Sequence, residues 1–319
     1  MSRSISPMRS KRLSRYQLMK TIHLTALAAP AIVLVFIFSY IPMGGLIVAF
    51  KDYNVRDGIL GSPWIGLKNF EFFFKNDAFN VTRNTILYNM AFIVVGLIAS
   101  LAFALMLNEL TSRKLTKFYQ TTFFFPYFFS WVIVAYMVYS FMAPNGIIPS
   151  NGAISGLLGN LLGIDLKDFY VSASIWPAFL VLLNTWKNLG YSSVLYYAAI
   201  MGISTDYYEA AEIDGASRLQ RIRYITLPLL LPLISIMTLL NIGSIFRSDF
   251  GLFWFVPREI GKLFAVTSVI DVHVYRILRL SNDIGMSAAI GFYQSVLCFI
   301  LVLLSNYAVK KIEPEYAAF

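Results

Sequence analysis

One polar segment of the chain has residue types and spacing suited to contact with another protein. It begins with Glu-Ala-Ala at 209–211, reaches Gly215 after three more residues, and ends in Ile-Thr-Leu-Pro at 225–228, nine residues further on. Ala210 and Ala211 keep a helix slim, so that a partner's surface can approach closely. The segment is charged and lies between two long apolar runs. The spacing therefore favours a docking hairpin over residues 204–228.

The rules for helix ends indicate how the first half of this hairpin is held. Asp206 can cap a helix that starts at Tyr207. Glu209 then occupies the third helical position, where its carboxylate can reach back to the amide of the cap. Gly215 follows Asp214 where a left-handed residue would end the helix. We expect a short, stiff helix with an abrupt end.

The second half of the hairpin has its own helix signals. Ser217 can cap another short helix, and Pro228 fits the first turn of the apolar run that follows. An ordinary loop with caps selected for stability would explain such residues singly, but not small, acidic and basic residues at this complete spacing. The residues predicted to dock on a partner are Glu209, Ala210, Ala211, Asp214, Gly215, Arg218 and Arg221.

Polar and aromatic side chains inside the apolar runs form a second candidate site, a path for a polar solute. The candidates are Asn184, Trp186, Lys187, Tyr191, Ser192, Asn241, Tyr293 and Gln294. A lysine in mid-membrane costs about 2.5–3.5 kcal/mol on insertion scales, so Lys187 should face a cavity or another subunit. Alternatively it snorkels toward the membrane surface. Polar residues between helices also serve simply as interhelical contacts.

Other kinds of site lack their residues. His23 and His273 have no carboxylates nearby at metal-ligand spacing, so no metal site is predicted. There is no G-x-x-x-x-G-K-[ST] loop to hold the phosphates of ATP and no serine or cysteine nucleophile motif. The single cysteine, Cys298, cannot form an internal disulfide and is expected to be a small packing residue. We therefore expect no catalysis and no bound cofactor.

The elements that position these residues are expected to be membrane helices. Of 319 residues 58% are apolar and 13% are charged, about half the charge of a typical soluble domain. About 20 apolar residues suffice to span a bilayer. The sequence predicts an all-α membrane protein with six spans, at residues 22–50, 84–108, 119–143, 173–202, 227–246 and 284–309.

The basic residues predict the orientation. Residues 1–20 carry six lysines and arginines and no acid, which indicates a cytoplasmic N-terminus. Six spans then return the C-terminus to the cytoplasm and place the hairpin there as well. The first apolar run is too long for the core of a cleaved signal peptide. The net charge of +9 needs no nucleic-acid partner, because basic ends lie against anionic lipid.

The predicted organisation is one membrane domain with short extensions. Residues 1–20 are a basic cytoplasmic segment, 21–310 the transmembrane domain, and 311–319 a cytoplasmic tail. Within the transmembrane domain, we expect an amphipathic helix on the membrane surface at residues 67–75 and a cytoplasmic loop at residues 111–117. The external loops are expected at 51–80, 144–172 and 247–283. The charges of the last loop form either a solvated face or a surface for an external partner.

At this point the chain resembles a known family, the permease subunits of carbohydrate ABC importers of the maltose-permease type. The hairpin resembles the loop by which such permeases bind their ATPase subunits. The similarity to the branch that imports polysaccharide-derived oligosaccharides extends over most of residues 40–310. It is carried by Phe50-Lys-Asp-Tyr-Asn54, Gly61-Ser-Pro-Trp-Ile-Gly-Leu-Lys-Asn-Phe70, Arg83-Asn-Thr85, Pro126-Tyr-Phe-Phe-Ser-Trp131 and Asp271-Val-His-Val-Tyr-Arg276.

The resemblance implies an assembly in a bacterial cytoplasmic membrane and the type I importer fold. This permease would pair with a second one as a heterodimer, and two ATPase subunits would hold ATP and Mg²⁺. An extracellular binding protein would deliver the oligosaccharide. The chain lacks the extra N-terminal spans of the larger maltose permease, so their roles are not carried over.

Three alternatives stay open at the level of sequence. In the first alternative the chain is an importer permease for a solute other than a sugar, since related hairpins occur in importers of many solutes. In the second alternative the chain is a secondary transporter, although its spans hold no acidic residue except Glu109 at an edge. In the third alternative the chain is a membrane enzyme or an assembly factor, but no set of catalytic residues is visible.

Overall fold

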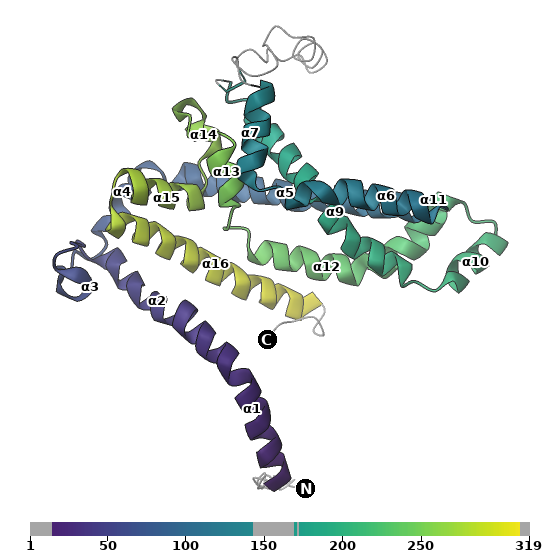
Figure 1. The fold of residues 1–319 in the computed structure, drawn as a ribbon, viewed down its shortest axis with the longest axis horizontal. Helices are drawn as coiled ribbons and strands as arrows, with labels where there is room; N and C mark the ends of the chain where they lie inside the picture. Colours follow the sequence, from purple (N-terminus) through teal and green to yellow (C-terminus); the bar gives the residue numbers. More distant parts are fainter. Residues whose placement is uncertain (1–14, 143–168, 171, 313–319) are drawn as a thin grey trace, which may run out of the picture.

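A computed structural model describes residues 15–142, 169–170 and 172–312, and nearly all of them are helical (Figure 1). Within these ranges the β-structure is a single isolated bridge between Lys51 and Trp64. The all-α class predicted from the sequence is confirmed. Most of the basic segment 1–20, most of the loop 144–172 and most of the tail 311–319 lie outside the described residues.

Four helical segments in the described part of the chain are long and apolar enough to span a bilayer. The first, at 23–50, runs through α1 (Arg15–Val35), η1 (Phe36–Tyr40), α2 (Ile41–Met43) and η2 (Gly44–Phe50), and it extends away from the other helices in Figure 1. The others are α5 (Ala78–Asn108), a helix over 218–243, and α16 (Ile284–Ile312), whose qualifying segment is 284–307. These match four of the predicted spans.

The span predicted at 119–143 contains a sharp break. Two helices, α6 (Arg113–Phe124) and α7 (Trp131–Met142), meet there at 96°, with the 3-10 turn η3 (Phe125–Phe128) between them. Pro126 lies in that turn and Phe129 is extended, which ends the helical hydrogen bonding. Apolar content alone does not show this break, because both arms are equally rich in aromatic residues. The helix α6 also takes up most of the predicted loop at 111–117.

The fourth predicted span corresponds to α9 (Trp176–Met201), a helix of 26 residues. At 1.5 Å per residue it is about 39 Å long, enough to cross a bilayer. Its polar residues make it less apolar than the four helices above. By length and composition the described residues therefore contain four spans, or five if α6 and α7 form one broken span.

Short helices build a layer at one end of the molecule (Figure 1). They are α4 (Lys68–Asn76), as predicted, and α13 (Phe250–Phe255), η6 (Gly261–Leu263), α14 (Phe264–Thr267) and α15 (Ile270–Leu280). Several charges in this layer serve the fold. Arg276 binds Glu259 through two hydrogen bonds of 2.8 and 3.0 Å. Burial lowers the pKa of His273, while Asp77 at 3.8 Å opposes that shift.

Candidate functional sites: the hairpin and a polar cavity

The first helix of the hairpin, α10 (Thr205–Ile213), begins two residues earlier than the sequence predicts. Its cap is Ser204, whose hydroxyl accepts a hydrogen bond of 3.3 Å from the amide of Asp206. The predicted cap at Asp206 and the third-position role of Glu209 are therefore wrong, since a serine upstream offers the same chemistry. Glu209 instead lies in the middle of α10 and is exposed.

The end of α10 is as predicted. Gly215 has a φ of +77°, in the left-handed region. The amide of Ala216 donates to the carbonyl of Ala211 at 2.9 Å, and the amide of Gly215 donates to the carbonyl of Glu212 at 3.0 Å. These two bonds form a Schellman motif, which satisfies the last carbonyls of the helix and turns the chain sharply.

The second helix, α11 (Arg218–Arg221), has the predicted cap. Ser217 and Gln220 form a reciprocal capping box, with bonds of 2.7 and 3.4 Å. Arg221 lies 3.1 Å from the carboxylate of Glu212, which joins the two helices of the hairpin. The caps of both helices and this ion pair together stiffen the hairpin.

Pro228 lies in the first turn of the helix that starts at Leu227, as predicted, but no break in the helix precedes it. The helix runs unbroken from α11 through η5 (Ile222–Thr226) into α12 (Leu227–Gly243). In η5 the turn widens, and the amide of Leu227 bonds to the carbonyl of Ile222, five residues back. Such a π turn accommodates a proline, which lacks the amide needed for regular helical bonding.

The residues predicted to dock on a partner lie together at the end of the molecule opposite the layer of short helices (Figure 1). Glu209, Ala210, Asp214, Gly215 and Arg218 are exposed. Ala211 and Arg221 are half-buried. The hairpin is therefore a stiff, solvent-exposed projection with small side chains on α10.

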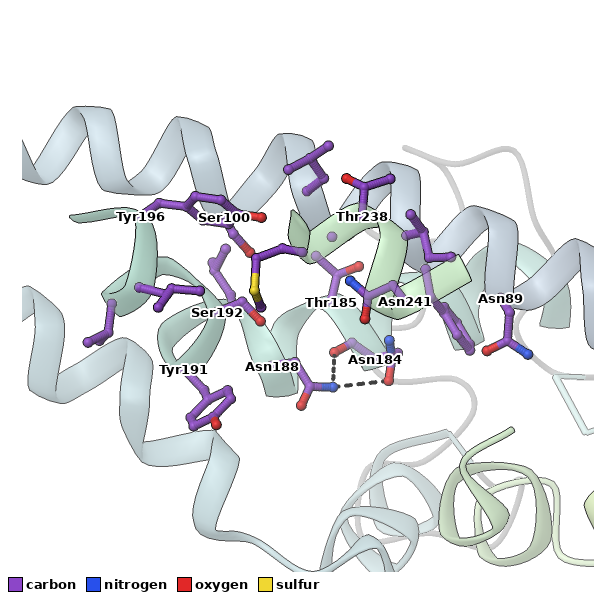
Figure 2. A pocket seen from close by; sticks show the side chains of 18 of the residues that line it. Asn89, Ser100, Asn184, Thr185, Asn188, Tyr191, Ser192, Tyr196, Thr238 and Asn241 are labelled. Carbon is purple, nitrogen blue, oxygen red and sulfur yellow. Dashed lines mark hydrogen bonds between the residues drawn. The ribbon is translucent and has the colours of Figure 1, made fainter. Parts of the chain in front are cut away.

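The second site is a cavity of about 750 Å³ between α5, α9 and α12. Its wall is a mixture of apolar residues with amides and hydroxyls (Figure 2). The side-chain amide of Asn188 donates to the carbonyl and the side-chain oxygen of Asn184, both at 3.0 Å. Neutral donors and acceptors of this kind suit a polar ligand with many hydroxyl groups.

Four residues predicted for the solute path line this cavity: Asn184, Tyr191, Ser192 and Asn241. The exposed ring of Tyr191 stacks on that of Tyr127, with the centroids 4.4 Å apart and the planes 6° from parallel. The sequence analysis missed several polar lining residues, namely Asn89, Ser100, Thr185, Tyr196, Thr238 and Ser244. Helical spacing along α5 would have pointed to Asn89 and Ser100, which lie on one face together with Gly96.

The other four predicted path residues lie outside this cavity. Lys187 is buried; its ammonium donates to the carbonyl of Tyr127 at 2.8 Å and lies within 5.3 Å of the Tyr127 and Trp131 ring centres. Trp186 packs against the main apolar cluster. The hydroxyl of Tyr293 lies 3.0 Å from the hydroxyl of Thr82. The side-chain amide of Gln294 donates to the carbonyl of Phe246 at 2.7 Å. In this structure these side chains hold helices together.

Membrane-spanning helices, an exposed hairpin and a polar cavity define a transport protein of the membrane. The chain belongs to the family described as the binding-protein-dependent transport system inner membrane component, whose model matches residues 92–314. It is therefore a multi-pass permease component of an ABC importer in the cell membrane. The family is a transport component and has no catalytic role of its own.

Two relatives from Bacillus subtilis (strain 168) are similar over most of the chain. Protein LplB is 31% identical over 290 residues, covering 91% of this chain and 89% of LplB. The polygalacturonan/rhamnogalacturonan transport system permease protein YteP is 30% identical over 297 residues, covering 92% of this chain and 89% of YteP.

A solved structure shows the same fold. It is that of a bacterial ABC transporter involved in the import of the acidic polysaccharide alginate, one chain of which is 29% identical with a TM-score of 0.80. The match covers 93% of this chain and 98% of the other. A second structure of the alginate transporter, in complex with an alginate pentasaccharide-bound periplasmic protein, matches with a TM-score of 0.79. The type I ABC permease fold is thereby confirmed.

Proposed function

We propose that this chain forms one half of the translocation pathway for an oligosaccharide and is driven by ATPase subunits that bind the 209–228 hairpin. One observation carries the proposal: a single unbroken helix, 218–243, leads from the hairpin to the wall of the polar cavity. A push on the hairpin therefore acts on a helix that contributes Thr238 and Asn241 to that wall. The hairpin residues named above are the proposed contacts with the ATPase.

An oligosaccharide fits the chemistry of the cavity. Asn184, Ser192 and Asn241 offer amides and hydroxyls, and Tyr191 offers an exposed aromatic face. Sugars present both hydroxyl groups and apolar ring faces, which match these two kinds of wall. The proposal also agrees with the relatives, since YteP belongs to a polygalacturonan/rhamnogalacturonan transport system and the solved transporter is involved in the import of alginate.

The proposed assembly contains a second permease, two ATPase subunits that hold ATP and Mg²⁺, and an external binding protein. The binding protein is supported by the alginate importer's complex with its periplasmic protein. The proposed topology has six spans and cytoplasmic termini, with α9 as the fourth and the bent pair α6–α7 as the third. The layer of short helices that includes α4 and α15 then faces the binding protein.

The test is reconstitution of the complete assembly in proteoliposomes with its binding protein and a panel of oligosaccharides. We expect some oligosaccharides to stimulate ATP hydrolysis and to enter the vesicles. Asn241→Leu should lower uptake about two- to tenfold, the equivalent of one hydrogen bond. Leu240→Ala, at an exposed neighbour that does not line the cavity, is the matched control.

Two results would contradict the proposal. Uptake that persists without the ATPase subunits would indicate a secondary transporter. Stimulation by a non-sugar solute alone, with every oligosaccharide inactive, would indicate an importer of another class.

A further inference from the structure

A partly buried pair of hydroxyls joins the hairpin to the helix that reaches the cavity. The hydroxyl of Tyr208, on α10, lies 2.9 Å from that of Thr226, the last residue of the π turn η5. The two residues are 18 positions apart in the sequence. Thr226 is only 2% exposed, and Tyr208 is half-buried. Either hydroxyl can be the donor, and the bond is partly shielded from water because Thr226 is buried.

The other side-chain links of the hairpin are weaker. The Arg221–Glu212 pair joins α11 to α10, but the side chain of Glu212 is 73% exposed. Arg218 lies 3.7 Å from Glu109 at the end of α5, and its side chain is 77% exposed. Exposed ion pairs contribute about 0–1 kcal/mol, because water and salt screen them. The Tyr208–Thr226 bond is better shielded from water than these two ion pairs, because Thr226 is buried.

The position of Thr226 suits the transmission of movement. Leu230, one turn further along, is 1% exposed and packs with Ala104, Tyr196 and Ile200. From Thr226 to Thr238 on the cavity wall is twelve residues of continuous helix, about 18 Å. A displacement of the inner end of this helix therefore reaches the cavity, with the Leu230 cluster as the packed contact in between.

We propose that the Tyr208–Thr226 hydrogen bond is a positioning contact that makes α10 and the 218–243 helix move as one body. The inference rests on the proposed function, because it assumes that ATPase subunits push on α10. Without the bond, α10 can tilt about the Gly215 turn while the helix behind it stays in place. ATP hydrolysis would then continue with less movement at the cavity wall.

The experiment measures sugar transported per ATP hydrolysed in the reconstituted complete assembly. Tyr208→Phe and Thr226→Val each remove one hydroxyl and keep the shape of the side chain. Each should lower the ratio about two- to tenfold, as expected for one hydrogen bond. The double variant should be no worse than either single variant, because both lose the same contact. Thr226→Ser keeps a hydroxyl and should keep most of the wild-type ratio.

Tyr224→Phe is the matched control, because Tyr224 is 68% exposed and lies in the same π turn. It should leave the ratio at the wild-type value. The amount of ATPase that co-purifies, which a general loss of structure would lower, should stay the same for Tyr208→Phe. The melting temperature should fall by no more than the loss of one hydrogen bond explains.

A wild-type ratio in both Tyr208→Phe and Thr226→Val would overturn the inference, as would a loss of assembly that accounts for the whole effect. Failure of the proposed function looks different, since the wild-type assembly itself would then show no sugar-stimulated hydrolysis.

Discussion

Gly215 shows how a single residue sets the shape of the hairpin. Its φ of +77° lies where a side chain costs about 1–2 kcal/mol. An added Cβ would meet no neighbouring atom within 4 Å, so that cost is entirely one of backbone conformation. The glycine is therefore required by the turn after α10 and not by packing.

Gly215→Ala should weaken the ordered hairpin by about 1–2 kcal/mol, while Gly215→Asn should cost less because asparagine tolerates this region. Gly215→Pro should leave the protein inserted and uncouple uptake from hydrolysis. The measurements are membrane insertion, co-purification of the ATPase subunits and sugar-stimulated hydrolysis. Wild-type coupling in both the alanine and the proline variants would argue against a docking role for the hairpin.

The residue scale also shows what the sequence predicted well. Gly215 and Ser217 act through their immediate neighbours, so local rules placed them correctly. Asp206 was misplaced because Ser204, two residues upstream, competes for the same cap and local rules do not rank the two. Lys187 was expected to face a cavity or another subunit, but its contacts with Tyr127 and Trp131 depend on the bend between α6 and α7, which the sequence did not reveal.

At the scale of elements, α9 crosses α6 closely, beside the part of the cavity wall that Phe124 contributes. Gly190 allows this approach. A Cβ at that position would lie 2.2 Å from the carbonyl oxygen of Phe123 and 2.5 Å from the Cα of Phe124. Both are backbone atoms, which cannot rotate away as a side-chain end can.

Gly190→Ala should therefore push α6 and α9 apart and destabilise the protein by about 1–3 kcal/mol, the usual cost of overpacking. Gly291→Ala in α16 is the matched control. An added Cβ there meets nothing within 4 Å, and alanine is the better helix former, so the control should be neutral or stabilising. Thermal unfolding in detergent checks both variants. Equal melting temperatures would mean that the crossing is looser than the structure shows.

The elements also mark the limit of sequence reasoning about the site. Apolar runs located most of the helices, because a helix that spans the lipid needs about 20 consecutive, mainly apolar residues, which can be read directly from the sequence. The cavity is a three-dimensional property of α5, α9 and α12, and residues such as Thr185 and Thr238 become recognisable only when those helices are placed side by side (Figure 2). Gln294 looked equally suited to a path, yet it bonds to Phe246 and Asp271.

At the scale of the whole molecule, the two ends of the long axis differ in structure. The hairpin projects at one end, and the layer that contains α4 and α15 lies at the other (Figure 1). The proposed function needs these two ends on opposite sides of the membrane, with the hairpin inside. The six basic residues of segment 1–20 support that orientation, because lysine and arginine favour the cytoplasmic side.

Cysteine labelling tests this orientation directly. Cys298, the one native cysteine, is first replaced by alanine. Leu219→Cys in α11 and Lys262→Cys in η6 then place single thiols at two exposed positions. A charged maleimide added outside right-side-out vesicles cannot cross the hydrocarbon core. It should label Lys262→Cys at once and Leu219→Cys only after permeabilisation. Labelling of Leu219→Cys from outside would place the hairpin beyond the reach of any cytoplasmic ATPase, and the proposed coupling would be wrong.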